Sequence, residues 1–469
     1  MIIKGIKMLC KVVAAMLGVA IGINSVGAHA VESTPETYKV LSLFGDVFER
    51  VRAQYVTVPD EKKMIQGALS GMVAALDPHS YYMNPEEARA MMEDTQGQFG
   101  GIGFTVMRQD KVLKIVSTIK DSPAYRAHLK EGDLISQINH VDVKTMSSLQ
   151  EAVKKMHGAV GTFVTLTIVR AGTQKPFDVK LRREIIKVPA VKYNVNHDVG
   201  YIKLIEFTDQ TYDGLTKAIK DIQSKIPRDK LKGYIIDLRL DPGGLLDQAV
   251  KVADAFLDDG VIVSTKGRIP NSMMRFVAHK GELVDHKPLV VLINGGTASA
   301  AEILAGALHD HHRATVVGTR SFGKGSVQSI IPLGKDGALR LTIALYYTPS
   351  GESIQGRGIA PDYVVNEPVP EKYKAYKVTL GESELQGHIK GKEEGKAGSG
   401  SSGYVPLDPK EDVQLKAAYD LLHGIKPKAV PAVQDSKKEQ LKNATQKSAV
   451  EPKAGDKKLA PLDMKLQKK

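Results

Sequence analysis

Apolar residues recur every three to four positions between residues 37 and 93, with breaks at Pro59 and at Asp77-Pro78. This spacing predicts a helical region over 31–96, because it gathers apolar side chains on one face of a helix. After it the pattern changes to short strands rich in β-branched residues, with one amphipathic helical segment among them. The sequence therefore predicts a separate α+β domain over 97–185.

A third pattern begins near residue 186, where short apolar runs alternate with helical patterns. The runs 233–240 and 288–294 are each followed by a helical pattern, which is typical of a largely parallel sheet covered on both faces. We therefore expect an α/β core over 186–375 and, for the whole chain, a multidomain α/β protein.

The C-terminal part differs in composition. Residues 376–411 are rich in Gly, Lys and Ser, which predicts a linker or mobile loop. Residues 412–424 predict a short helix that completes the core. The remainder, 425–469, has too few large apolar residues to bury a core, so we expect a disordered, Lys-rich tail.

Composition is ordinary for a folded protein, with 42% hydrophobic and 25% charged residues. The net charge of +12 is concentrated at the ends: residues 1–30 contribute +3 and residues 425–469 contribute +7. Because the body of the chain is close to neutral, composition gives no reason to expect a nucleic-acid partner.

The first 30 residues have the features of a secretory signal peptide. Three lysines precede an apolar run over 12–23, and small residues end at Ala28-His29-Ala30. The run is shorter than the ~20 residues that span a bilayer. We therefore expect cleavage after Ala30 and export to the periplasm, although an uncleaved signal holding the protein at the inner membrane stays open. Cleavage would remove Cys10, the single cysteine, and with it any disulfide or thiolate chemistry.

Several ordered motifs match one protein family. The sequence resembles the carboxy-terminal processing proteases, or tail-specific proteases, which are Ser-Lys peptidases with an inserted PDZ domain. The resemblance implies a crotonase/ClpP-like α/β protease core. The chain departs from the family pattern at Asp241, where Asn is usual, at Ala301, where a second Ser is frequent, and in an unusual His-rich run at 309–312. The matching motifs are Leu76-Asp77-Pro78-His79-Ser80, Phe99-Gly100-Gly101-Ile102-Gly103, Asp237-Leu238-Arg239, Pro242-Gly243-Gly244, Thr297-Ala298-Ser299-Ala300 and Phe322-Gly323-Lys324-Gly325-Ser326-Val327-Gln328.

The resemblance implies that Ser299 is the nucleophile, Lys324 its general base and Gln328 an orienting partner. A serine hydroxyl needs a base to take its proton. A lysine is a base only when uncharged, so burial must lower its pKa from ~10.4 to about 7 or 8. Apolar neighbours such as Val327 and Ile330 are expected to form the dry wall that does so.

Ser299 also has a purely structural interpretation. Ser299 and Glu302 form the S-x-x-E pattern of a capping box at a helix start. The two roles are compatible, because amides at a helix N-terminus can stabilise an oxyanion. We expect Gly243 or Gly244, together with Ala300, to present those amides.

The resemblance assigns substrate capture to the PDZ domain. It implies protein substrates with accessible apolar C-termini, and family members include assemblies and proteases that use adaptors, so a homo-oligomer and an adaptor lipoprotein are open partners. Arg170, at the end of a strand, is a candidate reporter of an occupied groove. The expected groove residues are Gly101, Ile102, Gly103 and Phe104 in the loop and Leu149 and Val153 on the helix.

Other functions fit the motifs less well. Gly318 to Lys324 nearly spells a phosphate-binding P-loop, but Gly325 follows where the motif needs Ser or Thr. A Ser-His-Asp hydrolase would need a partner such as Asp237, yet no G-x-S-x-G surrounds Ser299. A catalytically idle PDZ scaffold or chaperone stays an alternative. The spacing of His309, His311 and His312 favours no metal site, and we expect no metal and no cofactor.

Overall fold

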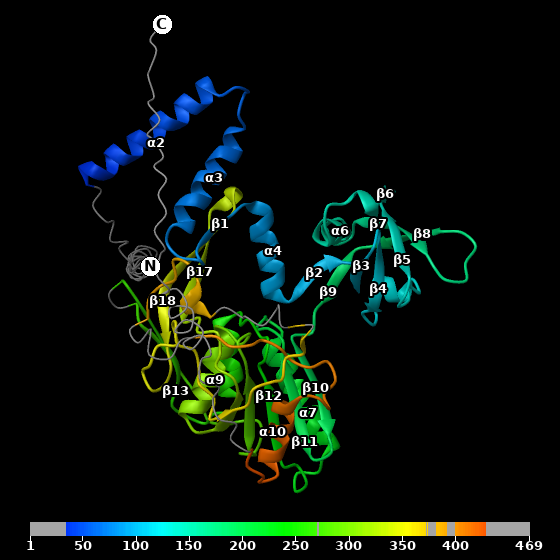
Figure 1. Cartoon of the computed structure of the whole chain (residues 1–469), viewed down its shortest axis with the longest axis vertical. Coiled ribbons are helices and arrows are strands. Elements are labelled where there is room, and N and C mark those ends of the chain that lie inside the picture. The colour runs from blue at the N-terminus through cyan, green and yellow to red at the C-terminus, as the bar shows by residue number, and fades with distance from the viewer. Residues whose placement is uncertain (1–33, 270–271, 372, 374–380, 392–398, 428–469) are drawn as a thin grey trace, which may run out of the picture. The chain divides into compact units, whose positions relative to one another are not determined.

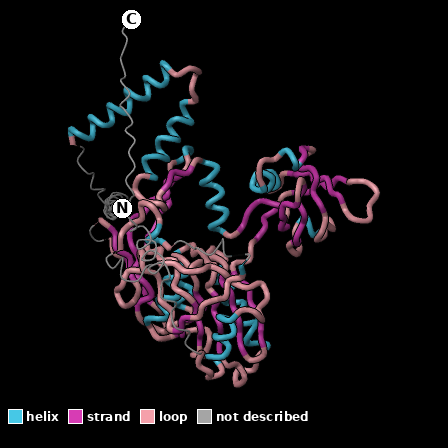
Figure 2. The backbone as a smooth tube through the Cα atoms, in the orientation of Figure 1, coloured by secondary structure: helices cyan, strands magenta, loops and turns pink. Residues whose placement is uncertain are grey.

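The computed structural model describes residues 34–269, 272–371, 373, 381–391 and 399–427 (Figures 1 and 2). The expected signal peptide, 1–30, and all but three residues of the expected tail, 425–469, lie outside these ranges. The chain divides into two units, 1–68 and 69–469.

The first unit consists of helix α2 (Pro35–Gln54) and the beginning of α3 (Glu61–Ala74). Thr34 caps α2 by accepting a hydrogen bond from the Thr37 N–H, and Pro35 occupies the first turn. No residue of α2 is buried. Across the residues that the structure describes, no helix combines the length and apolar character that crossing a membrane requires.

The second unit departs early from the helical prediction for 31–96. A short strand, β1 (Tyr81–Met83), pairs antiparallel with β18 (Ala338–Tyr347) and precedes helix α4 (Pro85–Gln96). Asn84 and Glu87 form a capping box at the start of α4, and Gly97 ends it with φ of 63°. A strand of three residues is too short to show a period, so the pattern of apolar residues does not reveal it.

Residues 97–187 form a small α+β domain, as expected. Strands β2 (Gln98–Gly101) and β9 (Glu184–Lys187) pair antiparallel where the chain enters and leaves it. The predicted amphipathic segment is helix α6, and Ser148 caps it. The sheet of this domain has the order β3-β4-β5-β7-β8, with β6 beside β5. The elements are β3 (Phe104–Gln109), β4 (Val112–Thr118), α5 (Pro123–Arg126), β5 (Leu134–Ile138), β6 (Val141–Asp142), η1 (Val143–Thr145), α6 (Leu149–Met156), β7 (Phe163–Val169) and β8 (Phe177–Arg182).

The predicted α/β core is a six-stranded sheet of order β10-β11-β12-β15-β16-β19, parallel from β11 onward (Figure 1). Ile236 and Val291 belong to the core cluster that includes α7, α8 and α9, whereas their neighbours Ile235 and Val290 belong to the cluster that includes α10. Helices therefore cover both faces, as the apolar runs predicted. The elements are β10 (Val191–Asn196), β11 (Val199–Leu204), α7 (Thr211–Lys225), β12 (Gly233–Asp237), α8 (Leu246–Asp254), β15 (Leu289–Ile293), α9 (Ala300–Asp310), β16 (Ala314–Gly318), β19 (Tyr363–Val364) and α10 (Val413–Leu422).

A second sheet belongs to the same unit, and the sequence pattern did not predict it. It has the order β1-β18-β13-β14, and β17 also pairs with β18. This sheet helps to position Lys324, because β17 begins two residues after it. The remaining elements are β13 (Val261–Gly267), β14 (Met274–Val277), β17 (Ser326–Pro332), η2 (Gly334–Asp336) and η4 (Glu382–Glu384).

The described parts of 376–411 make specific contacts with the core, which differs from the linker or mobile loop that we expected. The Glu382 N–H donates to the Phe322 carbonyl, and the Gly400 N–H donates to the Ser321 carbonyl. The Ser401 hydroxyl donates to the Arg320 carbonyl at 2.7 Å. Gly and Ser are typical of flexible segments, but here small residues allow close packing: a Cβ on Gly381 would lie 2.2 Å from the Ser399 carbonyl oxygen.

Candidate active site

Ser299 lies where the loop after β15 turns into α9. Its backbone has φ of 54° and ψ of −116°, a conformation that a non-glycine residue rarely adopts. The preceding loop holds it there: the Thr297 hydroxyl donates to the Leu238 carbonyl at 2.8 Å, and the Asn294 side-chain oxygen accepts from the Leu240 and Gly296 N–H groups. The side chain is therefore presented by a rigid strand-to-helix turn.

A single buried carboxylate joins this turn to the loop of Lys324. Glu302 is fully buried and accepts hydrogen bonds from the backbone N–H groups of Ser299 (2.8 Å), Gly323 (2.7 Å) and Lys324 (2.9 Å), and from the Ser321 hydroxyl. Burial raises the pKa of Glu302 to about 7, against the opposing effect of these four donors. The capping pattern indicated the bond to Ser299, but no sequence signal indicated the bonds to the second loop.

Lys324 has the environment that a lysine base requires. Its side chain is only partly exposed. Burial is the main cause that lowers the pKa of Lys324 to about 8; the positive charge of Arg340 acts in the same direction, and Glu382, Glu302 and Asp77 oppose both. The expected lowering is confirmed, but the expected wall is only partly correct, because Val327 is buried whereas Ile330 is 46% exposed.

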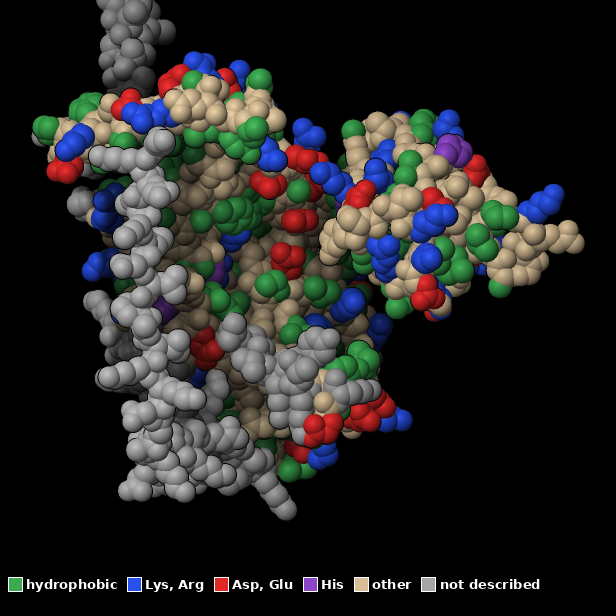
Figure 3. Space-filling view, turned by 45° about the horizontal axis from the view of Figure 1, so that its top comes forward, with side chains coloured by type: hydrophobic (Ala, Val, Ile, Leu, Met, Phe, Trp, Pro, Cys, Tyr) green, Lys and Arg blue, Asp and Glu red, His purple; other side chains and the backbone are tan. Residues whose placement is uncertain are grey.

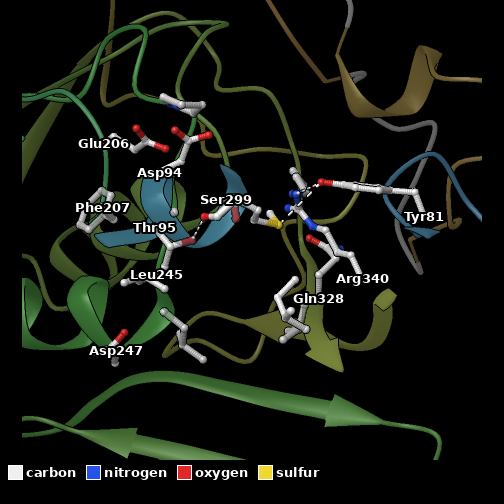
Figure 4. Close-up of a pocket in the computed structure, with 18 of the residues that line it drawn as sticks. Tyr81, Asp94, Thr95, Glu206, Phe207, Leu245, Asp247, Ser299, Gln328 and Arg340 are labelled. Carbon is white, nitrogen blue, oxygen red and sulfur yellow. Dashed lines mark hydrogen bonds between the residues drawn. The ribbon is translucent and has the colours of Figure 1, made fainter. Parts of the chain in front are cut away.

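Ser299 and Lys324 line the same cavity, which has a volume of about 1050 Å³. One face of helix α4 forms one wall of this cavity, and the loop after β12 forms another. Figure 4 shows Ser299 between two acids, Asp94 and Glu206, on one side and the neutral Gln328 and the cationic Arg340 on the other. The cavity is lined by polar, charged and apolar side chains that include Tyr81, Glu87, Asp94, Glu206, Gly243, Gly244, Asp247, Ser299, Lys324, Gln328, Ile330 and Arg340.

Gly243, one of the two glycines expected to form an oxyanion hole, lies directly against Ser299. A Cβ on Gly243 would approach the Ala298 oxygen to 2.7 Å and the Ala300 nitrogen to 2.8 Å, and Gly243 has φ of 97°, so only glycine fits. The Gly243 N–H donates to the Asp241 carboxyl at 2.9 Å. Among the described residues, the N–H groups of Gly244 and Ala300 have no protein acceptor. These two amides are therefore the ones free to meet an oxyanion.

Asp241 itself is a buried carboxyl beside this loop. Its second oxygen has no hydrogen-bond partner in the described part of the chain. Burial raises the pKa of Asp241 well above its usual value, and the nearby charge of Glu206 adds to the rise.

Comparison with known proteins agrees with this geometry. Residues 198–365 match the model of peptidase family S41, residues 100–181 that of the PDZ domain, and residues 22–87 that of the activating protease CtpB N-terminal domain. The carboxy-terminal-processing protease of Bartonella bacilliformis is 62% identical over 388 residues, which is 83% of this chain and 89% of that protein. The chain belongs to the carboxy-terminal processing proteases of family S41.

Two further similarities are found at lower identity. The carboxy-terminal processing protease CtpA of Bacillus subtilis is 38% identical over 316 residues, covering 67% of this chain and 66% of that protein. A solved structure of the photosystem II D1 C-terminal processing protease is 25% identical, covers 71% of this chain and 95% of its own, and has a TM-score of 0.42. From its family and its domain matches, this protein is a serine-type peptidase with a PDZ domain at residues 100–181.

Gln328 of this protease lines the cavity but does not contact the lysine. Its amide nitrogen donates to the Ser326 hydroxyl at 2.9 Å and to the Thr342 hydroxyl at 3.1 Å. The described residues include no hydrogen bond between Gln328 and Lys324. The expected orienting contact is therefore not made in this conformation.

The Asp-Leu-Arg motif of the protease has a structural role. Arg239 is fully buried and pairs with Asp237 at 2.7 Å and with Asp412, next to α10, at 2.8 Å. Asp237 also accepts from the Tyr201 hydroxyl at 2.7 Å. Its side-chain partners are thus an arginine and a tyrosine, so Asp237 is not the acid that a Ser-His-Asp site would need.

The histidine run of the protease is split among different partners. His309 lies 3.2 Å from the Asp362 carboxylate, and His311 contacts the Val261 carbonyl oxygen at 2.7 Å. In the described ranges, no three His, Cys, Asp or Glu side chains come together in a way that could hold a metal ion.

The expected PDZ groove residues lie at the end of β2, in the loop that follows, at the start of β3 and on helix α6. Gly103 has φ of 82°, and a Cβ there would lie 2.2 Å from the Ser122 Cβ. Ile102 is buried in the domain core, while Phe104, Leu149 and Val153 pack against that core and stay partly exposed. Gly101 ends β2.

The candidate reporter Arg170 already has a partner within the PDZ domain. It pairs with the Asp133 carboxylate at 2.7 Å and donates to the His128 carbonyl.

On the face shown in Figure 3, acidic, basic and hydrophobic side chains are interspersed over the PDZ domain.

Proposed function

We propose that this protein is an exported endopeptidase that captures the C-terminal tail of a protein in its PDZ domain and cleaves it through an acyl-enzyme on Ser299, with Lys324 as general base. One observation carries the catalytic part of the proposal: Ser299 and Lys324 line one cavity, and their backbones are fixed by the same buried carboxylate, Glu302. The lowered pKa of Lys324, about 8, supports its role as the proton acceptor.

In the proposed reaction, the neutral Lys324 amine takes the proton of the Ser299 hydroxyl as its oxygen attacks the scissile carbonyl carbon. The N–H groups of Gly244 and Ala300 stabilise the oxyanion that forms. The Lys324 ammonium then gives its proton to the nitrogen of the leaving amine, which departs and leaves an ester on Ser299. Water, deprotonated by the same amine, hydrolyses the ester and restores the enzyme.

A cleavage assay tests the catalytic assignment. The substrate is an unstructured protein ending in apolar residues, and the enzymes are wild type, Ser299→Ala, Lys324→Met and, as a matched control, Lys280→Ala at an exposed lysine. We expect cleavage by wild type and by the control, and none by the other two. Equal cleavage by wild type and Ser299→Ala would contradict the proposal and favour a scaffold or chaperone that merely binds tails.

Export is tested separately, by cell fractionation and N-terminal sequencing. A cleaved signal gives a periplasmic protein that begins at Val31. A full-length chain in the cytosolic fraction would contradict export without affecting the catalytic assignment.

A further inference from the structure

The catalytic cavity holds a second cation, Arg340, which the proposed reaction does not use. Arg340 lies on β18, opposite Tyr81 of β1 and Ile330 of β17 in the two strand registers. Cross-strand partners point to the same side of a sheet, and all three residues line the cavity that contains Ser299 and Lys324. The guanidinium is therefore presented to whatever occupies the site (Figure 4).

Within the described part of the chain, the Arg340 guanidinium has no anionic partner. It donates a hydrogen bond to the Tyr81 hydroxyl at 3.2 Å and lies 5.5 Å from the centre of the Tyr81 ring. The Nε atom is buried without an acceptor, and no carboxylate of the described residues forms an ion pair with Arg340. An arginine carries a planar fork of donors that matches a carboxylate, and most of that fork is unused here.

Three of the four acids that line the cavity lie across Ser299 from Arg340; the fourth, Glu87, accepts a hydrogen bond from the Asn84 N–H at the start of α4. Figure 4 shows Asp94 and Glu206 beyond Ser299 from Arg340, and Asp247 also lies on that side. Asp94, Glu206 and Asp247 thus lie on one side of the nucleophile and Arg340 on the other. A peptide that crosses Ser299 meets the carboxylates at one end and the free guanidinium at the other.

We infer that Arg340 is a specificity-determining residue that binds a carboxylate of the peptide substrate close to the scissile bond. The inference rests on the proposed function and deepens it. The carboxylate belongs either to an Asp or Glu side chain or to a chain terminus, because both present the same two oxygens to the guanidinium. The positive charge of Arg340 also disfavours the charged form of Lys324. An anion bound to Arg340 weakens this effect, so binding of a substrate carboxylate is linked to the protonation of Lys324.

The test uses a set of short peptides built on one cleavable sequence. Glu or Gln is placed in turn at each of four positions on either side of the scissile bond, and each peptide is made with a free and with an amidated C-terminus. Wild type is compared with Arg340→Gln, with Arg340→Lys, and with Arg275→Gln as a matched control on an exposed arginine of the same sheet.

We expect wild type and Arg275→Gln to prefer Glu over Gln about tenfold in kcat/KM at one or more positions, a factor equal to about 1.4 kcal/mol. Arg340→Gln should lose this preference, and Arg340→Lys should keep part of it, because it retains the charge without the fork. A preference that follows the free C-terminus instead of Glu identifies the terminus as the source of the carboxylate.

A second readout is independent of peptide choice. In Arg340→Gln the lower pH limit of kcat/KM on the Gln peptides should move to higher pH, because the charge that disfavours the ammonium is gone. This shift tests whether the charge of Arg340 acts on Lys324, and the preference for a carboxylate tests whether Arg340 binds the substrate. The inference is overturned if wild type shows no preference for a carboxylate at any position, or if the preference survives in Arg340→Gln. If wild type cleaves none of the peptides, the proposed function is overturned, and this inference with it.

Discussion

At the scale of single residues, Lys324 determines how the activity should depend on pH. The proposed reaction needs a neutral Lys324, and the pKa of this residue is about 8. We therefore expect kcat/KM for a neutral peptide to rise about tenfold per pH unit below pH 8 and to level off above it. An activity that stays constant between pH 6 and 9, or that falls as the pH rises through 8, would contradict the assignment of Lys324.

Glu302 provides a second test at the same scale. Glu302→Gln keeps the shape but places an amide NH₂ against N–H donors, so at least one of the bonds to Ser299, Gly323 and Lys324 is lost. At pH 8, above the Glu302 pKa of about 7, these are bonds to a charged group, and each such bond contributes about 1.5–3 kcal/mol. We expect kcat/KM to fall about 100-fold while substrate binding changes little.

The matched control for Glu302 is Glu36→Gln, at an exposed glutamate of α2. It should leave kcat/KM unchanged. If Glu302→Gln retains the activity of that control, the carboxylate does not position the two catalytic loops.

Candidate roles could be given to single residues only where a motif carried them. Ser299 and Lys324 came from the family resemblance, and the need for a lowered lysine pKa followed from its chemistry alone. Arg340 and the second pair of Glu302 bonds were not predictable, because they depend on contacts between segments that are far apart in sequence. The same holds for Gln328, whose hydrogen bonds go to Ser326 and Thr342 in place of the lysine.

At the scale of elements, α10 is held to the core by a buried ion pair. Asp412→Asn keeps an N-cap for α10 but removes the charge that faces Arg239 at 2.8 Å. Because Arg239 keeps its second partner, Asp237, the loss is that of a buried hydrogen bond to a charged group, about 1.5–3 kcal/mol. We expect the denaturant concentration at the midpoint of unfolding to be lower in Asp412→Asn than in wild type.

Asp420→Asn on the same helix is the matched control, because it breaks only an exposed pair with Lys416. Such pairs contribute about 0–1 kcal/mol. Equal effects of the two substitutions on the unfolding midpoint would show that the buried pair does not secure α10.

Elements were predictable in proportion to their length and regularity. The amphipathic helix α6 and the buried strands β12 and β15 appeared where the pattern of apolar residues indicated. The sheet of β13, β14, β17 and β18 was not predicted, although Leu339, Leu341, Ile343 and Leu345 alternate with other residues along β18. Strand β1 exists only because β18 pairs with it.

At the scale of the whole molecule, the protease joins a PDZ domain to a catalytic core, and the two should be separable by substrate. Val153 packs against the PDZ core and stays partly exposed on α6. We expect Val153→Asp to raise KM about tenfold for a protein with a free apolar C-terminus, and to leave kcat/KM for a short peptide unchanged.

The control is Val141→Asp, the same substitution at an exposed valine of the PDZ domain, which should alter neither substrate. An equal loss of activity on the protein and on the short peptide in Val153→Asp would mean that α6 does not bind the tail.

The central claim is that one serine, activated by one lysine, forms an acyl-enzyme, and covalent labelling tests it most directly. The protein is treated with a serine-reactive phosphonate, and the adduct is located by peptide mass spectrometry. The account predicts one adduct, on Ser299, whose rate of formation rises with pH through about 8 and is strongly reduced in Lys324→Met. An adduct on another residue, or labelling of Ser299 at the same rate without Lys324, would contradict it.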